Sequence, residues 1–295
     1  MYPATTTWNL DPLTLLWMAL LLGAYAYALG PLHRRRAPDD VTPRWRIVCF
    51  AGGWALLLLT MISPLDTLGR YYLFSAHALQ LFIIITAGAP LLLLGVPEWL
   101  MWVLLPTRAL RNATRGLLFT VIAVVAFNAL VLIWHVGPLY EAGLHHAPLH
   151  NLENLSFVLA GVLTWWPLMT PLDRETRLAS PTQILYLVIE SLPLDVFGAF
   201  TLFAQNVFYH TYAVAPRVLG FSPLGDQAAG GAIIAVPGNV VDIILMSLVF
   251  FGWIQSVEKE QRERERLQYA DEDTAGVNVA RANVATSQAG SDTQS

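Results

Sequence analysis

Seven long apolar stretches exclude a water-soluble fold for this chain. Each holds about 20 residues, which is enough for a helix to cross the ~30 Å hydrocarbon core of a bilayer. A backbone inside lipid must satisfy its own hydrogen bonds, so these stretches are expected to be helices. The predicted spans are residues 12–32, 46–63, 72–94, 117–136, 149–169, 184–207 and 233–254. The sequence therefore predicts an all-α, polytopic membrane bundle of seven transmembrane helices.

Composition agrees with this class and defines two regions. The chain is 55% hydrophobic and 13% charged, about half the charge of a soluble domain, which excludes a soluble enzyme, a disordered protein and a nucleic-acid binder. Residues 1–257 are predicted to form the membrane domain. Residues 258–295 carry dense charge and then polar sequence, so a mostly disordered tail is expected. The apolar segment 96–106 is too short to span the membrane, so we expect it to lie at the membrane interface or to form a re-entrant segment.

The cationic residues predict an orientation. Fifteen of the 17 Lys and Arg residues fall on one side of the seven predicted spans, and only Arg70 and Arg217 fall on the other. Because Lys and Arg accumulate in cytoplasmic loops, we expect the N-terminus outside and the C-terminal tail in the cytoplasm.

This orientation places six of the seven histidines at the outer face. His77 lies near the outer end of the third span, His135 ends the fourth, and His150 begins the fifth. Imidazole is a common ligand for copper and zinc, so these three residues are candidate metal ligands. Histidines that only form hydrogen bonds at the interface are an equal alternative. Further candidates in the outer loops are His145, His146 and His210.

Four acidic residues lie within or at the ends of spans: Glu153, Glu190, Asp195 and Asp242. An ionised carboxylate near the middle of a membrane is costly, so such groups face the bundle, find partners or stay protonated. Structural pairing with nearby hydroxyl, amide and backbone groups is favoured over a proton path.

Four motifs resemble one known family, the multi-helix cytochrome c oxidase assembly proteins of the bacterial CtaG type, over roughly residues 10–256. They are His77-Ala78-Leu79-Gln80 with the run to Gly95, Trp134-His135-Val136-Gly137-Pro138-Leu139-Tyr140, His150-Asn151-Leu152-Glu153-Asn154, and Asp226-Gln227-Ala228-Ala229-Gly230-Gly231 with Val236-Pro237-Gly238. The resemblance implies a multi-pass protein of the bacterial inner membrane. It also implies a role in assembling a haem–copper oxidase, with copper held or delivered at the outer face.

The family pattern bears on the ligands residue by residue. His77, His135 and His150 match positions that the resemblance implies to be copper ligands, and Asp226 is either a further oxygen ligand or a cap. The chain departs from the pattern at three positions, where the family carries two histidines and a methionine. These positions are Leu81, Asn154 and Ile234.

Three functions follow as hypotheses. The first is a membrane assembly factor that contacts oxidase subunits and lipid and holds copper. The second is a metal-free scaffold or accessory subunit of the oxidase, favoured by the three departures. The third is a proton- or ion-coupled transporter that uses Glu190, Asp195 and Asp242. An enzyme is not expected, because the sequence contains no nucleophile–base motif and no phosphate-binding loop.

Overall fold

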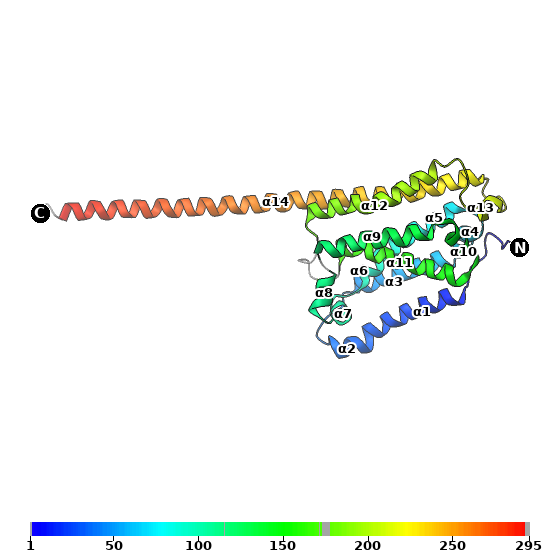
Figure 1. Ribbon diagram of the computed structural model, residues 1–295. Coiled ribbons are helices and arrows are strands. Elements are labelled where there is room, and N and C mark those ends of the chain that lie inside the picture. The colour runs from blue at the N-terminus through cyan, green and yellow to red at the C-terminus, as the bar shows by residue number, and fades with distance from the viewer. Residues whose placement is uncertain (1, 115, 171, 173–177, 293–295) are drawn as a thin grey trace. The chain divides into compact units, whose positions relative to one another are not determined.

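The predicted fold class is confirmed. The computed structural model describes residues 2–114, 116–170, 172 and 178–292, with side chains as far as Tyr269. In that part all regular structure is helical, and seven helical segments are long and apolar enough to cross a membrane (Figure 1). They are Pro12–Arg36, Arg44–Ile62, Phe74–Gly95, Gly116–Trp134, Ala147–Met169, Ser180–Leu202 and Pro223–Tyr269.

Two of these spans contain a π-helical turn. The first span consists of α1 (Pro12–Tyr27), η1 (Ala28–Leu32) and α2 (His33–Arg36), and the third of α5 (Phe74–Ile83), η2 (Ile84–Gly88) and α6 (Ala89–Gly95). Single π turns inside helices are often found at functional sites. The remaining spans lie in α3 (Arg44–Ile62), α9 (Gly116–Trp134), α11 (Ala147–Met169), α12 (Ser180–Leu202) and α14 (Pro223–Asp292).

In the part of the chain that the structure describes, five short helices connect the spans. The apolar segment at 96–106 forms α7 (Glu98–Leu104), which is not among the spanning helices, and α8 (Arg108–Ala113) follows it. Three others were not predicted: α4 (Pro64–Tyr71), α10 (Gly137–His145) and α13 (His210–Val214). They lie together at the end of the bundle where the chain begins, which we call the N-terminal end (Figure 1).

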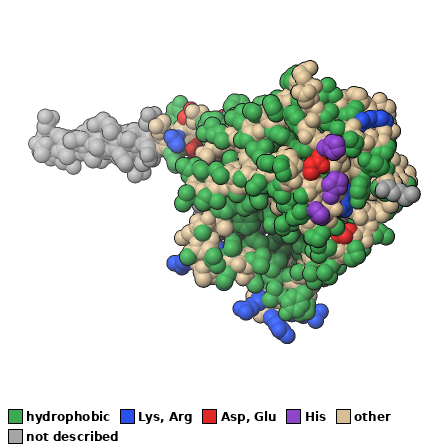
Figure 2. Space-filling model, turned by 45° about the vertical axis from the view of Figure 1, so that its right-hand side comes forward, with side chains coloured by type: hydrophobic (Ala, Val, Ile, Leu, Met, Phe, Trp, Pro, Cys, Tyr) green, Lys and Arg blue, Asp and Glu red, His purple; other side chains and the backbone are tan. Residues whose placement is uncertain are grey.

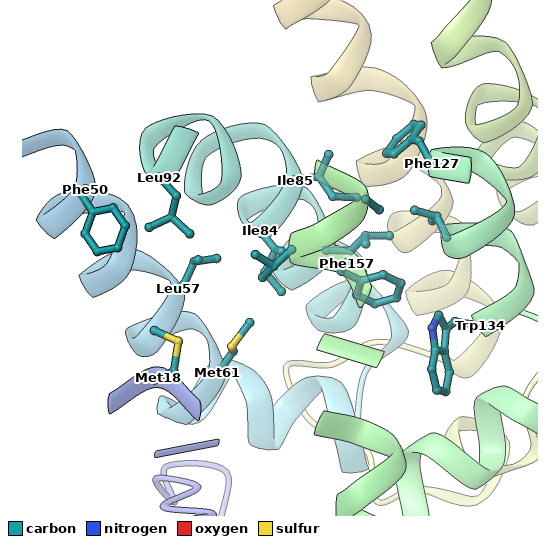
Figure 3. Packing of buried hydrophobic residues seen from close by; sticks show 14 of the residues in the cluster. Met18, Phe50, Leu57, Met61, Ile84, Ile85, Leu92, Phe127, Trp134 and Phe157 are labelled. Carbon is teal, nitrogen blue, oxygen red and sulfur yellow. The ribbon is translucent and has the colours of Figure 1, made fainter. Parts of the chain in front are cut away.

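The core forms around α11 and the third span. Phe157 of α11, Ile84 of η2 and Leu57 of α3 are all at most 1% exposed and belong to one apolar cluster (Figure 3). Helices α3 and α6 approach very closely, since a Cβ atom placed on Gly95 would lie 2.5 Å from the Cβ of Phe50. Such close packing fixes the helix axes that carry the polar residues described below.

The chain divides into two compact units, Met1–Leu245 and Met246–Ser295. In the second unit α14 continues as a helix to Asp292, and the side chains of residues 250–269 are exposed. An i,i+4 ion pair joins Arg262 to Glu258 at 2.5 Å, although exposed pairs of this kind stabilise little. The predicted boundary at residue 257 and the disorder of the tail stay predictions.

The inside–outside orientation also stays a prediction. Of the cationic residues that support it, Arg115, Arg174 and Arg177 lie outside the described residues.

Candidate functional site

The three predicted histidines meet in one buried cluster at the N-terminal end of the bundle. His77 is in the first turn of α5, His135 directly follows α9, and His150 is in the first turn of α11. Their exposed fractions are only 3%, 6% and 3%. The shared position follows from the topology, because α5 and α11 begin at the end of the bundle where α9 finishes.

Glu153 links the histidines. Its Oε1 lies 3.8 Å from Nε2 of His77, and its Oε2 lies 3.4 Å from Nδ1 of His150. The imidazole of His77 is also next to that of His135, with 5.6 Å between the ring centroids. We call His77, His135, His150 and Glu153 the histidine cluster.

The hydrogen bond of His135 defines which nitrogen is free. Its Nδ1 is 2.8 Å from the carbonyl oxygen of Val131, so Nδ1 carries the proton and donates it. Nε2 then bears a lone pair, and this buried atom has no hydrogen-bond partner. Burial lowers the pKa of His135 to about 4, so the ring is neutral at physiological pH. A neutral imidazole oriented by its other nitrogen is the usual form of a metal ligand.

His150 is oriented in a similar way by Asp66. The Nε2 of His150 lies 2.8 Å from Oδ1 of Asp66, and the amide nitrogen of Asn154 is farther away, at 3.2 Å. We take Nε2–H to donate to the carboxylate, since that contact is the shorter and is charge-assisted. Nδ1 of His150 is left buried without a hydrogen bond.

Asp66 is a residue of the candidate site that the sequence analysis missed. It lies in the first turn of α4, which Ser63 caps through a bond from Leu65 N, and it is 0% exposed. Burial alone would raise the pKa of Asp66, but the imidazole of His150 and hydrogen bonds from His150, Asn9 and Gln80 outweigh it and hold the pKa below its ordinary value. The sequence offered one signal for this residue: Asp66 comes two residues after Ser63-Pro64, a typical helix start, and lies between two predicted spans.

The cluster concentrates unpaired polar atoms. In the described part of the chain, eight buried side-chain nitrogen and oxygen atoms lack a hydrogen-bond partner, and six of them belong to the histidine cluster. They are Nδ1 and Nε2 of His77, Nε2 of His135, Nδ1 of His150, and both carboxylate oxygens of Glu153. Buried polar groups are nearly always satisfied in proteins, so this concentration makes the cluster the candidate ligand site.

The donors do not yet converge on one point. Within the described residues, no group of three His, Cys, Asp or Glu side chains is arranged so that it could hold a metal ion. His77 and His135 are neighbours, whereas His150 is connected to them through Glu153. The donor set fits a metal such as copper in its chemistry, and side-chain rotation would be needed to bring the donors together.

Three tyrosines cover the cluster on the side of α10 and α13. Tyr140 lies against His77 and His135, with ring centroids 5.1 and 5.6 Å away, and stacks on Tyr209 at 3.9 Å. The hydroxyl of Tyr212 donates to the carbonyl of Gly69 at 2.5 Å, so the hydroxyl of Tyr140 donates to Tyr212 at 2.7 Å. Burial raises the pKa of Tyr140 well above its ordinary value. We call Tyr140, Tyr209 and Tyr212 the tyrosine cap.

The other candidate ligands lie outside the cluster. His145, His146 and His210 are exposed, and Figure 2 shows histidine side chains gathered on one face near acidic ones. The Nε2 of His145 is 3.7 Å from a carboxylate oxygen of Glu141. Asp226 accepts hydrogen bonds from the backbone nitrogens of Phe74 and Ser75, at 2.7 and 3.2 Å, and thereby caps the start of α5.

The positions that depart from the family pattern offer no good copper ligand. Leu81 and Ile234 are buried among apolar side chains. The amide of Asn154 contacts His150, but an amide is a poor copper ligand.

The other intramembrane acids lie on α12 and α14. Glu190 accepts a hydrogen bond from the hydroxyl of Thr164 at 2.7 Å, and Asp195 accepts one from the amide of Asn239 at 2.9 Å. Asp242 is 9% exposed.

Fold and site together define a multi-span membrane helix bundle with a buried histidine–carboxylate cluster at one end. A family model described as cytochrome c oxidase caa3 assembly factor (Caa3_CtaG) matches residues 23–256, which is most of the chain. The protein therefore belongs to the caa3-type cytochrome c oxidase assembly factor family, as the sequence motifs predicted. No curated protein and no solved structure matches the chain.

Proposed function

We propose that this protein is an inner-membrane assembly factor that binds copper at the histidine cluster and delivers it to a haem–copper oxidase. Family membership supports the assembly role. The observation that carries the copper assignment is the set of six unpaired buried atoms on His77, His135, His150 and Glu153. In this proposal copper is cargo, and the protein carries out no turnover chemistry.

Each residue of the cluster has a defined part in the proposal. Nε2 of His135 presents a lone pair, because Val131 holds its Nδ1. Asp66 holds Nε2 of His150, so the nitrogen of His150 that would bind copper is Nδ1, which now lies 3.4 Å from Glu153 Oε2. His77 has both ring nitrogens free of hydrogen bonds and is the residue that can turn toward either neighbour. Glu153 supplies negative charge against a buried cation, which would otherwise be strongly destabilised in a low-dielectric interior.

Metal analysis of the purified protein tests the assignment. We expect copper to bind to the full chain in detergent and to be lost from the His77→Ala/His135→Ala/His150→Ala variant. The matched control is His145→Ala/His210→Ala, which removes two exposed imidazoles at the same end of the bundle and should keep the copper. Equal binding by both variants would contradict the proposal.

Delivery requires a second measurement. The oxidase purified from cells that carry the triple variant should contain less copper than the oxidase from cells with the wild-type factor. A full copper content in that oxidase would contradict copper delivery by this protein and leave it an assembly role without copper.

The outward location of the cluster is also part of the proposal, and the distribution of Lys and Arg supports it. A reporter that is active only in the cytoplasm should give a signal when fused after Ser295 and none when inserted after Leu144. The reverse pattern would place the histidine cluster at the cytoplasmic face.

A metal-free scaffold is the second candidate function. It is favoured by apolar residues at Leu81 and Ile234 and by the absence of a converged three-ligand group in the described residues. Leu81 is one helical turn after His77 and Asn154 one turn after His150, so Leu81→His and Asn154→His place imidazoles on the same helix faces. Tighter copper binding by the double variant would indicate a depleted copper site. No copper in either the double variant or the wild type would favour the scaffold.

A further inference from the structure

A second polar region lies inside the bundle, away from the histidine cluster. Helices α5, η2, α9, α11, α12 and α14 line a partly open cavity of about 70 Å³, which is room for several water molecules. Three carboxyl groups line it: Glu190 and Asp195 from α12 and Asp242 from α14. Glu190 is near the middle of the 23-residue helix α12, so the cavity reaches the interior of the membrane.

Positive charge is missing from this cavity. No Lys, Arg or His lines it in the part of the chain that the structure describes. Helices α5, η2, α9 and α11 contribute apolar side chains and the hydroxyls of Thr86 and Thr164, with no charged group. The hydroxyl of Tyr186 is hydrogen-bonded to Thr164, but Tyr186 does not itself line the cavity. The lining therefore offers the three carboxyl groups no opposite charge.

Asp242 differs from the other two acids because it has no partner within the described part of the chain. Glu190 is held by Thr164 and Asp195 by Asn239, but Asp242 forms no hydrogen bond or ion pair with any described residue. It is nonetheless 9% exposed and faces the cavity. A buried carboxyl group without a protein partner needs water, a proton or a cation beside it.

We propose that this cavity is an intramembrane proton-binding site, in which Glu190 and Asp242 take up and release protons through water in the cavity. Protons fit the site better than a metal ion, because no three acidic side chains among the described residues are arranged to hold one. The proposal is independent of copper, since the cavity lining contains no histidine.

Modification by dicyclohexylcarbodiimide tests the proposal. This apolar reagent enters from lipid and reacts with protonated carboxyl groups. With the full chain in lipid nanodiscs, we expect Glu190 and Asp242 to be modified at pH 7 at least about tenfold faster than Glu258 and Glu260, because exposed carboxyl groups are ionised at that pH. Modification of Glu190 and Asp242 should fall as the pH is raised to 9. Mass mapping of the modified peptides reads out each position.

Variants and salts make the test specific. Glu190→Gln keeps an oxygen that accepts the Thr164 hydrogen bond, and Asp242→Asn removes no protein contact, so both should fold and lose modification only at the changed position. Rates at Glu190 and Asp242 no faster than at Glu258 would overturn the proposal, and the wild type alone gives this result. Protection by NaCl relative to choline chloride at equal ionic strength would also overturn it, by assigning the cavity to a metal cation.

Discussion

The histidine cluster and the acidic cavity both bury ionisable groups, but they solve the problem of burial differently. In the cluster, carboxylate and imidazole groups lie within 4 Å of one another and are covered by tyrosines. In the cavity, three carboxyl groups line a space of about 70 Å³. Glu190 and Asp195 have neutral partners, and Asp242 forms no hydrogen bond with any described residue. Removing one side chain from a buried charged network leaves its partners unpaired and destabilises the protein. A cavity with room for water tolerates the loss of one carboxyl group better. The two regions should therefore respond unequally to the same kind of substitution.

The largest effect is expected at Asp66. Asp66→Ala removes the acceptor for His150, Asn9 and Gln80 and should destabilise the protein by about 3–5 kcal/mol, as expected for breaking a buried pair from one side. Thermal unfolding in detergent measures the loss. Asp66→Asn keeps one acceptor oxygen and should fall between the wild type and Asp66→Ala.

The matched substitution in the cavity is Asp242→Ala. Because Asp242 has no protein partner to leave unpaired, its removal should change stability by less than about 1 kcal/mol. Equal losses of stability from Asp66→Ala and Asp242→Ala would contradict the proposed difference between the two regions.

A second prediction concerns the helix contact beside the cavity. A Cβ atom on Gly231 of α14 would lie 2.5 Å from the backbone nitrogen of Leu202 and 2.6 Å from the carbonyl oxygen of Gly198. Gly231→Ala must push α14 away from α12 and should cost about 1–3 kcal/mol. It should also speed the carbodiimide reaction of Asp242 by widening the cavity. Gly252→Ala is the control, since its Cβ meets nothing within 4 Å.

A smaller loss of stability is expected from substitution of Asp11, which caps α1 at the N-terminal end of the bundle. Asp11 caps α1 through Thr14 N at 3.0 Å and accepts from the amide of Asn151 at 2.7 Å. Asp11→Ala should destabilise the protein by about 1 kcal/mol at pH 7. Asp11→Asn keeps a capping oxygen and should lose less.

The pH dependence of this effect has a definite sign. Burial by itself would raise the pKa of Asp11, but hydrogen bonds from Thr14 and Asn151 hold it below the ordinary value of 3.8. A carboxyl with a lowered pKa stabilises the fold above its unfolded-state pKa and loses that contribution as the pH falls through its folded-state pKa. The difference in stability between the wild type and Asp11→Ala should therefore shrink in acid. A difference that grew in acid would contradict the assigned partners.

The smallest effect is expected from the tail. Truncation after Tyr269 removes residues that have little apolar surface to bury, so the stability of the membrane domain should change by less than about 0.5 kcal/mol. Truncation after Leu245 is the contrasting control, because it also removes the apolar second half of the seventh span. A large loss from the first truncation would show that the tail packs on the bundle.

The sequence predicted the spans and the histidines because both depend on local features. Apolar length alone marks a membrane helix, and a histidine at the end of such a helix is visible without knowledge of the packing. The seven spans were therefore found with their ends shifted by a few residues, most of all in the last one, where the helix begins at Pro223.

The contacts between distant segments could not be predicted in this way. Asp66 is 84 positions from His150, and the eight-residue helix that carries it has too short a pattern to be recognised. The acids were found as residues, but the cavity between Asp242 and Glu190 arises only when α12 and α14 pack beside α11. Pairing across such separations depends on the three-dimensional arrangement of the helices.

In the proposed copper role, the tyrosine cap would bear on how long the ion stays bound. The hydroxyls of Tyr140 and Tyr212 form a chain that ends on the carbonyl of Gly69, and Tyr209 donates to the carbonyl of His135 at 2.9 Å. Under that proposal, an ion that left the cluster past α10 and α13 would have to wait until these bonds opened together. The dwell time of the ion would then depend on the opening rate of the cap as well as on affinity, and a partner that pulled α13 aside would release the ion without weakening a single ligand.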